Sequence, residues 1–372
     1  MRTLLLASAV VVWCGALRQT RRVWRSRQLG SIDNLELEEI QIAEALAPDC
    51  ARVRVGAIGL NFADVFSVLG LYAAFSEQPP LSVAGLEFAG TVEEAGAACG
   101  YAVGDRVFGF TRFGAFADSV TQRGKLLRPT PAGWTDAEAA ALLVQGLTAY
   151  YGLAKLGAAT AGSRVLVHSA AGGVGMLSLE ICAALGCDAV GVVSSDAKKD
   201  AIHARFPAEV ADGRFKVLVR PARRPDRAYR DHLRHVPRFD VVLESLGGPW
   251  FSEALDRLAP MGRLVHFGAT HSYGAAAGGP LKWLSLVPSY LRRPMVDPGE
   301  LTSSNRAVFG FNLIWLTERE DVLEAALAEL LDCAGGRPPC LDGAAFHFDD
   351  LPGALKHLQS GKTTGKVVVR VP

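Results

Sequence analysis

The sequence predicts an α/β protein with two domains, a β-rich domain followed by a domain that is doubly wound around a parallel sheet. The chain has 372 residues, a length that suits two or three domains of roughly 150 residues each. Short strands without helical spacers fill residues 51–120, whereas strands and helices alternate from residue 164 onwards. A glycine-rich turn also joins one of these later strands directly to a helix, as in a βαβ unit.

The composition supports a folded enzyme or binding protein and excludes several other classes. Apolar residues make up 49% of the chain and charged residues 21%, which is typical of globular proteins and not of disordered chains. The net charge of +1 argues against a dedicated nucleic-acid binder. The cysteines form no CxxC motif and have no histidines at zinc-finger spacing, so we expect reduced thiols and no metal site.

The N-terminal segment has a different character. Residues 4–17 are nearly all apolar, several arginines flank them, and no acidic residue appears before Asp33. A short apolar run with basic flanks is typical of a signal peptide rather than of a membrane span. We therefore expect residues 1–21 to be a targeting or anchor segment, with an organelle or membrane location and possible membrane association; otherwise the protein would be cytoplasmic. A mis-assigned start or a disordered tail would give the same pattern.

The first domain is expected over residues 22–146. Residues 53–58, 87–93 and 105–110 have the apolar, glycine-punctuated pattern of short strands in a compact barrel. Thr135 then precedes two acidic residues and an alanine-rich run, which predicts the N-cap of a helix. A second helix is expected over residues 146–156.

The second domain is expected over residues 147–315. Its strands are predicted at residues 164–168, 188–193, 239–243, 262–267 and 307–311, and the first two flank a helix that ends at Gly186. After a helix at residues 317–331 with Thr317 as its N-cap, the pattern of the first domain reappears in strands at residues 346–348 and 366–371. We therefore expect residues 316–372 to return to the first domain.

The turn between the first two of these strands is suited to a phosphate-bearing ligand. It has the spacing Ala170-x-Gly172-x-x-Gly175. Glycine lets the backbone approach a pyrophosphate, and the N-terminus of the following helix supplies free N–H groups. We predict that the turn binds a dinucleotide through Ala171, Gly172, Gly173, Val174 and Gly175. A tight turn without a ligand is the alternative.

The end of the next strand indicates which dinucleotide is bound. NAD sites place an acidic residue there to accept hydrogen bonds from the ribose. This chain instead has Ser194 and Ser195, with Lys198 and Lys199 just beyond them. Hydroxyl and ammonium groups suit a 2′-phosphate, so we predict NADPH, although the two lysines would also fit a solvated helix face.

Several segments together resemble one enzyme family. They are residues 59–64 (GLNFAD), 70–72 (GLY), 85–90 (GLEFAG), 145–150 (QGLTAY), 165–175 (VLVHSAAGGVG), 241–248 (VVLESLGG) and 365–368 (GKVV). The chain resembles the zinc-independent quinone oxidoreductases of the medium-chain dehydrogenase/reductase superfamily from about residue 22 to its end. Residues 291–305 and 310–313 resemble the branch of the synaptic-vesicle membrane protein homologues. The resemblance implies a GroES-like β-rich catalytic domain, a Rossmann domain and a homodimer.

The same resemblance implies a set of site residues. Asn61 and Tyr72 would be hydrogen-bond donors near the nicotinamide and the substrate, although a turn residue and a lid aromatic are the simpler interpretations. Further cofactor contacts would come from Asn61, Thr148, Leu246, Gly268, Phe311 and Lys366. Leu86 occupies the histidine position of the Gly-His-Glu motif of the zinc-dependent relatives, so Glu87 is expected to be structural. Without a Lewis acid, the natural hydride acceptor is a quinone or an activated enone, whose oxyanion needs only hydrogen-bond donors.

Two departures from the family pattern leave alternatives open. Glu180 stands where the family usually has glutamine, and residues 200–238 contain ten Arg and Lys residues against five acidic ones. A solvated basic face explains this stretch better than a nucleic-acid patch, so we expect no nucleic-acid partner. The alternative function is that of a membrane-associated protein of the same fold with little catalytic activity.

Overall fold

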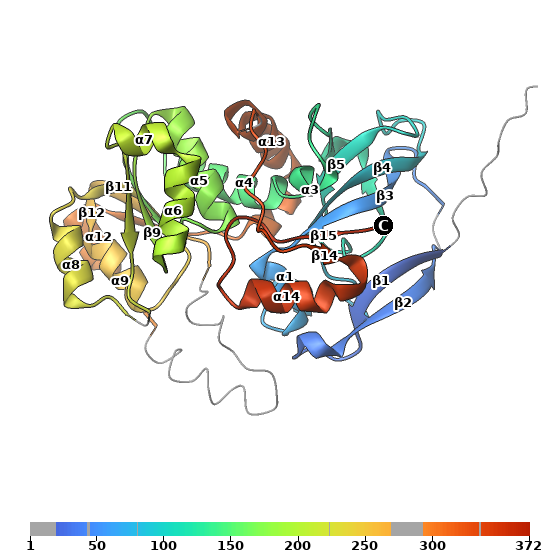
Figure 1. Ribbon diagram of the computed structural model, residues 1–372, viewed down its shortest axis with the longest axis horizontal. Coiled ribbons are helices and arrows are strands. Elements are labelled where there is room, and N and C mark those ends of the chain that lie inside the picture. Colours follow the sequence, from blue (N-terminus) through green and yellow to red (C-terminus); the bar gives the residue numbers. More distant parts are fainter. Residues whose placement is uncertain (1–19, 43–44, 80, 223, 269–292, 335) are drawn as a thin grey trace, which may run out of the picture.

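The computed structural model describes residues 20–42, 45–79, 81–222, 224–268, 293–334 and 336–372. Figure 1 shows two lobes, with β1–β5, β14 and β15 in one and β9, β11 and β12 in the other. Helices α4 (Leu143–Tyr150) and α13 (Glu320–Ala334) lie between them. The protein therefore has the two-domain α/β architecture that the sequence predicts.

The β-rich domain is built around one mainly antiparallel sheet. Its order is β14-β15-β3-β4-β5-β7, and β6 also pairs with β3. Strands β1 and β2 form a separate two-stranded sheet beside it. The strands formed by this part of the chain are β1 (Thr20–Ser26), β2 (Leu35–Gln41), β3 (Cys50–Gly59), β4 (Glu87–Ala95), β5 (Arg106–Phe110), β6 (Ser119–Arg123) and β7 (Leu127–Pro129), with helices α1 (Phe62–Val68) and α2 (Ala73–Ser76) between β3 and β4.

Two strands of this sheet come from the far end of the chain. Strand β15 (Val368–Arg370) pairs antiparallel with β3 and parallel with β14 (Phe346–His347). Helix α14 (Leu351–Gln359) lies between β14 and β15 in the sequence, and its Leu351 and Leu355 enter the apolar core of the β-rich domain together with Phe88. The C-terminal segment thus completes the first domain.

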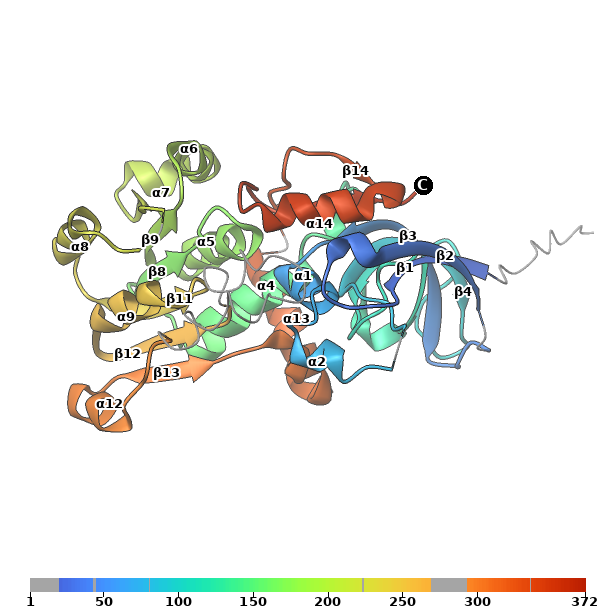
Figure 2. The ribbon, with the colours of Figure 1, turned by 90° about the horizontal axis from the view of Figure 1, so that it is seen from below.

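The second domain is a six-stranded parallel sheet with the order β10-β9-β8-β11-β12-β13. In chain order this is 3-2-1-4-5-6, the order of a Rossmann fold. Figure 2 shows these strands from another side, with α6 (Asp196–Arg205) and α7 (Pro207–Ala211) near one end of the sheet and α12 (Pro298–Ser304) at the other. The strands are β8 (Arg164–His168), β9 (Asp188–Val193), β10 (Phe215–Val219), β11 (Phe239–Glu244), β12 (Leu258–His266) and β13 (Ala307–Gly310).

Both faces of the parallel sheet are buried. Along β8, Val165 and Val167 face one core, whereas Leu166 faces another. Helices α5 (Gly173–Leu185) and α6 (Asp196–Arg205) cover the first face, and α8 (Arg227–Arg234) and α9 (Pro249–Asp256) cover the second. Burial on both faces explains why these strands are continuous apolar runs rather than alternating ones.

The expected helix ends are partly right. Thr135 does cap helix α3 (Asp136–Ala139), because its side chain accepts from the Glu138 N–H while Glu138 accepts from the Thr135 N–H. The helix expected from Thr317 is wrong at its start. Thr317 lies in a 3-10 helix, Leu313–Glu318, where its hydroxyl donates to the Ile314 carbonyl, and α13 begins at Glu320.

The localisation expected from the N-terminal segment needs correction. The described part of the chain contains no helix that is long and apolar enough to cross a membrane. Residues 1–19, which carry the apolar run, lie outside the described residues, and Thr20 and Arg21 belong to strand β1. The organelle or membrane location inferred from residues 1–21 is therefore withdrawn.

The basic stretch folds into helices and a strand, and several of its arginines form ion pairs. Arg205 binds Glu180, the residue that replaces the usual glutamine, with 2.7 Å between Nε and the carboxylate. Arg214 binds Asp212, and Arg230 binds Glu253. The two sequence departures, Glu180 and the basic stretch, thus meet in one ion pair.

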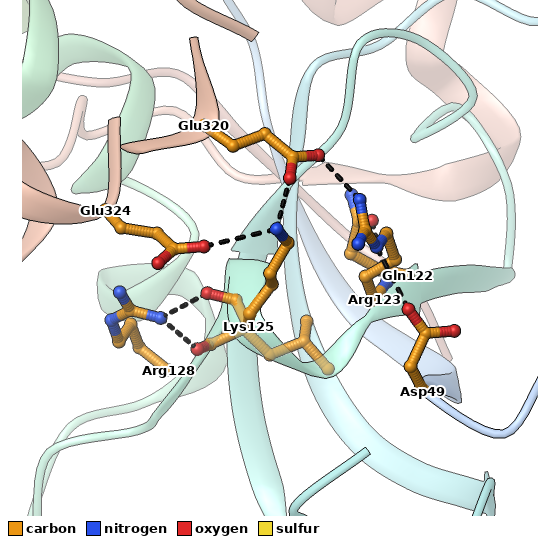
Figure 3. A network of polar contacts seen from close by, with 8 residues as sticks. Asp49, Gln122, Arg123, Lys125, Arg128, Glu320 and Glu324 are labelled. Atoms are coloured by element: carbon orange, nitrogen blue, oxygen red, sulfur yellow. Dashed lines mark hydrogen bonds and ion pairs between the residues drawn. The ribbon is translucent and has the colours of Figure 1, made fainter. Parts of the chain in front are cut away.

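A network of ion pairs joins the β-rich domain to α13 (Figure 3). The Arg123 guanidinium contacts Glu320 at 2.6 Å and Asp49 at 3.1 Å, and Lys125 pairs with both Glu320 and Glu324. All of these side chains are partly exposed. The network fixes the position of α13 against the strand end that carries Arg123.

Candidate active site

A cleft of about 1070 Å³ lies between the two domains. Asn61 and Tyr72 line it from the β-rich domain, and the parallel-sheet domain contributes the remaining predicted contacts. These are Thr148, Ala171, Gly172, Gly173, Val174, Gly175, Ser194, Lys198, Leu246, Gly268 and Phe311. Three predicted site residues, Ser195, Lys199 and Lys366, are not among its lining residues.

The glycine turn follows β8 and opens helix α5. Gly172 is the N-cap of α5, so the N–H groups of the first turn have no partner within the helix. A Cβ atom on Gly175 would lie 2.4 Å from the Ser169 carbonyl oxygen, which means that only glycine lets the helix pack this closely against the strand end. The result is a row of free N–H groups at the floor of the cleft, which fits a pyrophosphate.

Gln145 lies against this turn and was missed by sequence reasoning. Its side chain is only 8% exposed, and its Oε1 accepts no hydrogen bond within the described part of the chain. That oxygen lies over Gly173, 1.6 Å from where a Cβ atom would be. A buried acceptor without a hydrogen bond destabilises the fold unless a ligand donates that bond. Gln145 and the glycine turn together therefore fit a bound dinucleotide. Gln145 lies in the QGLTAY segment, which carried the family resemblance but no assigned role.

The ends of β9 and β10 form the part of the cleft suited to a 2′-phosphate. Ser194 and Lys198 line it, and the Lys198 Nζ donates to the Gly361 carbonyl oxygen at 2.7 Å. Arg220, which directly follows β10, also lines the cleft and packs over the Trp250 ring at 5.0 Å. Burial lowers the pKa of both Lys198 and Arg220. Sequence reasoning missed Arg220 because it treated the basic stretch as a solvated face. The position of Arg220 directly after the end of a strand could have indicated that it belongs to the site.

Below Asn61 lies a buried cluster of charges. The Lys366 ammonium donates to the Asn61 Oδ1 at 2.7 Å and also pairs with Glu87. The Asn61 amide donates to Glu87 at 2.9 Å, and the other Glu87 oxygen accepts from the Val144 N–H at 2.9 Å. Lys366 is therefore not placed as a direct cofactor contact. It fixes the orientation of Asn61, which does line the cleft.

Asp64 adds a second carboxyl group to this cluster. It accepts a hydrogen bond from the Asn61 backbone N–H at 2.7 Å and is completely buried. Burial raises the pKa of Asp64 to about 7, against a smaller opposing effect of that hydrogen bond and of Lys366. Burial also lowers the pKa of Lys366, although Glu87 acts in the opposite direction. Charges this far from water require paired partners. Glu87 and Lys366 provide them for each other, whereas the Asp64 Oδ1 has no hydrogen-bond partner among the described residues.

Tyr72 faces Asn312 across the cleft. Its hydroxyl donates to the Asn312 Oδ1 at 2.8 Å, and its ring packs edge-on against Phe113. Burial raises the pKa of Tyr72 to about 12, so the group is a hydrogen-bond donor rather than an acid at neutral pH. The contact links the loop after α1 to the segment that follows β13.

The comparisons with known proteins agree with this architecture. Residues 47–133 match the alcohol dehydrogenase GroES-like domain, and residues 209–369 match the family described as zinc-binding dehydrogenase. The human synaptic vesicle membrane protein VAT-1 homolog is 31% identical over 347 residues, which cover 91% of this chain and 84% of that protein.

Two solved structures extend the comparison. The quinone oxidoreductase of Escherichia coli, complexed with NADPH, is 25% identical with a TM-score of 0.73, and the match covers 94% of this chain and 99% of that chain. The enoyl reductase CurK is 25% identical with a TM-score of 0.75, covering 95% of this chain and 100% of that one.

The domains, the nucleotide cleft and these relatives define an NADPH-binding oxidoreductase of the medium-chain dehydrogenase/reductase superfamily. Its GroES-like domain and its Rossmann domain meet at the cleft in the way that the resemblance implies. Within that superfamily, the chain belongs to the zinc-independent quinone oxidoreductase-like family.

Proposed function

We propose that this protein transfers a hydride from NADPH to a quinone or an activated enone, and that it does so without zinc. The observation that carries the proposal is the pairing of Glu87 with Lys366 beneath Asn61. In this motif the zinc-dependent relatives use a histidine, whereas this chain has the buried, apolar Leu86. The Glu87 carboxylate, the other polar group of this motif, is already neutralised by the Lys366 ammonium group. The described residues contain no group of three or more His, Cys, Asp or Glu side chains suited to a metal ion.

The cleft supplies what a zinc-independent reduction requires. NADPH provides the hydride, and the protein contributes position and electrostatics. We assign to Asn61, held by Glu87 and Lys366, the positioning of the reacting groups, and to the Tyr72 hydroxyl a hydrogen bond to the substrate oxygen on which charge develops. Apolar side chains that line the cleft, among them Phe62, Phe66 and Leu71, would hold a planar acceptor and exclude water.

The names of the relatives support both classes of acceptor. One solved relative is a quinone oxidoreductase and another an enoyl reductase. The VAT-1 homolog, which carries the name of a membrane protein, is the reason to keep a second candidate, a protein of this fold with little catalytic activity.

The test is an anaerobic assay of the full chain with NADPH against a panel of quinones and enones. We expect NADPH oxidation with at least one of them, no loss of activity with a chelator, and well under one zinc per chain by elemental analysis. Stoichiometric zinc that tracks with activity would contradict the proposal. Tight NADPH binding without turnover on any acceptor would favour the second candidate.

A further inference from the structure

A carboxylate flanked by two histidines lies under the cleft, in a part of the site to which the proposed function gives no role. Glu244, at the end of β11, is completely buried. Its two oxygens contact the Nδ1 atoms of His168, at the end of β8, at 3.2 Å and of His266, at the end of β12, at 2.6 Å. The backbone N–H groups of Leu246 and Gly247 donate to the same carboxylate at 2.8 Å.

The surroundings of Glu244 keep it charged. Burial by itself would raise the pKa of Glu244, but the hydrogen bonds and charges of His168 and His266 lower it to about 2. A carboxylate that accepts from Nδ1 fixes the tautomer of an imidazole and stabilises its protonated form. The Nε2 atom of each ring is then the one that can exchange a proton with another molecule.

Only one of the two histidines is accessible. The side chain of His168 is 1% exposed, whereas that of His266 is 33% exposed. His266 lines the cleft together with its neighbours Phe267 and Gly268, and its ring is held edge-on against Phe251. It can therefore meet both a ligand and water.

The sheet order places His266 near the reactive end of the cofactor. The pyrophosphate turn follows β8, and the groups suited to the 2′-phosphate follow β9 and β10, on one side of β8. A dinucleotide that crosses the switch point between β8 and β11 has its other half over β11 and β12. His266 ends β12, so the half of the ligand that lies beside it is the nicotinamide half.

We propose that His266 is the proton donor of the reduction, with Glu244 and His168 as the residues that position it; this inference rests on the proposed function. When a hydride bonds to the acceptor, two electrons move onto the acceptor oxygen, which becomes an oxyanion, and NADPH is oxidised to NADP⁺. In this proposal the donor is the imidazolium form of His266, whose Nδ1–H stays bonded to Glu244. Its Nε2–H bond breaks, the proton bonds to the acceptor oxygen, and a neutral ring is left. The ring takes up a solvent proton through its exposed edge, so the reaction consumes one hydride from NADPH and one proton from solution.

The first experiment compares His266→Asn with the wild-type full chain on two acceptors, an enone and a quinone. The enolate oxygen is more basic than the oxygen of a reduced quinone, so enone reduction depends more on an acid. We expect the enone turnover to fall by about 10²-fold, as for the loss of other general acids, and the quinone turnover to fall by less than about tenfold. The exposed His347 offers a matched control, His347→Asn, which should change neither.

Two further measurements separate this role from a structural one. The dissociation constant of NADPH, measured by fluorescence in the absence of acceptor, should change by no more than about threefold in His266→Asn, since the proposed role lies in proton transfer rather than in binding. In the ligand-free protein, proton NMR should show a strongly deshielded Nδ1 proton that His266→Asn removes and His347→Asn keeps.

Each outcome either supports or overturns the assignment of His266 as the proton donor. The assignment of His266 would be overturned if turnover fell equally with both acceptors or fell with neither. It would also be overturned if the variant only bound NADPH more weakly, or if the wild type lacked the deshielded proton. If the wild type reduces neither acceptor, the proposed function fails and this assignment fails with it. If the wild type is active and the ratio of the two turnovers is unchanged in the variant, only the role of His266 is wrong.

Discussion

The hydroxyl of Tyr72 is the polar group most directly placed to reach a substrate from the β-rich domain. Tyr72→Phe keeps the ring and its contact with Phe113 but removes the hydrogen bond to Asn312. Loss of one oxyanion donor costs about 10²–10³ in turnover in other enzymes. We expect about tenfold here, because water can replace the hydroxyl in an open cleft. Steady-state kinetics with one quinone tests this, and Tyr101→Phe, which removes a hydroxyl bonded to the Leu127 carbonyl outside the cleft, is the control. Unchanged turnover in Tyr72→Phe would remove Tyr72 from the catalytic residues.

The preference for NADPH over NADH should depend on Lys198 and Arg220, which line the cleft, and not on Lys199, which does not. A hydrogen bond to a charged group contributes about 1.5–3 kcal/mol, so Lys198→Ala and Arg220→Gln should each weaken NADPH binding by about tenfold or more. NADH affinity should change little, because NADH has no 2′-phosphate. Titrations of NADPH and NADH with Lys198→Ala, Arg220→Gln and Lys199→Ala test this expectation. If Lys199→Ala has the same effect as Lys198→Ala, the assignment is wrong.

Asp64 should make stability depend on pH. Its pKa in the folded protein, about 7, exceeds the ordinary value of 3.8. The folded protein therefore holds this proton more tightly than the unfolded chain, and its stabilising contribution is complete below about pH 4 and is lost as the pH rises through about 7.

Asp64→Asn removes this titration while its amide oxygen can still accept from the Asn61 N–H. Relative to the variant, the wild type should lose up to about 4 kcal/mol of unfolding free energy between about pH 4 and pH 8. Urea unfolding of both proteins at several pH values measures the difference. Parallel pH profiles would contradict the expectation.

Sequence reasoning located the glycine turn between β8 and α5 well and the buried charges poorly. The glycines of the turn are required by backbone geometry, which leaves a local pattern in the sequence. The pairing of Lys366 with Glu87 joins residues 279 positions apart, and no local pattern encodes it. Gln145, Arg220 and His266 become site residues only once the fold brings their segments to one cleft.

At the scale of elements, the junction between β8 and α5 is tightly constrained by Gly175. In Gly175→Ala the new Cβ would meet backbone atoms of Ser169 and Ala170 at 2.4 and 2.5 Å, so the helix must move away from the strand. We expect a loss of about 1–3 kcal/mol in stability and an NADPH affinity lowered by about tenfold, since the free N–H groups move as well. Gly343→Ala, which places a Cβ in open space, is the control. Thermal unfolding and NADPH titration measure both effects, and wild-type behaviour of Gly175→Ala would refute the argument.

The elements of the parallel sheet were predictable because burial on both faces gives uninterrupted apolar strands. The start of α13 was not, because Thr317 satisfies the preferences of an N-cap yet lies in a separate 3-10 helix. Its hydroxyl contacts a carbonyl of that short helix instead of capping α13. Capping preferences are local, and they do not distinguish two helical segments that follow each other directly.

At the scale of the whole molecule, the network around Glu320 joins the β-rich domain to α13, the helix that lies between the two lobes. Because its members are partly exposed, each pair contributes at most about 1 kcal/mol, and salt screens it. Glu320→Gln should lower the melting temperature by about 1–2 °C at low ionic strength and by less in about 1 M salt. Asp332→Asn, on the same helix but outside this network, is the control. A decrease that does not depend on salt would show that Glu320 acts through packing.

The return of the C-terminal segment to the first domain also sets an order of events during synthesis. A ribosome adds Lys366 only 279 residues after Glu87, and strand β15 follows the whole second domain in the chain. Until then β3 lacks the neighbour that pairs with it along Val368–Arg370, and the carboxylate beneath Asn61 lacks its counter-charge. Contacts so distant in sequence form late and slowly. The β-rich domain therefore cannot complete its sheet until the whole Rossmann domain has been synthesised.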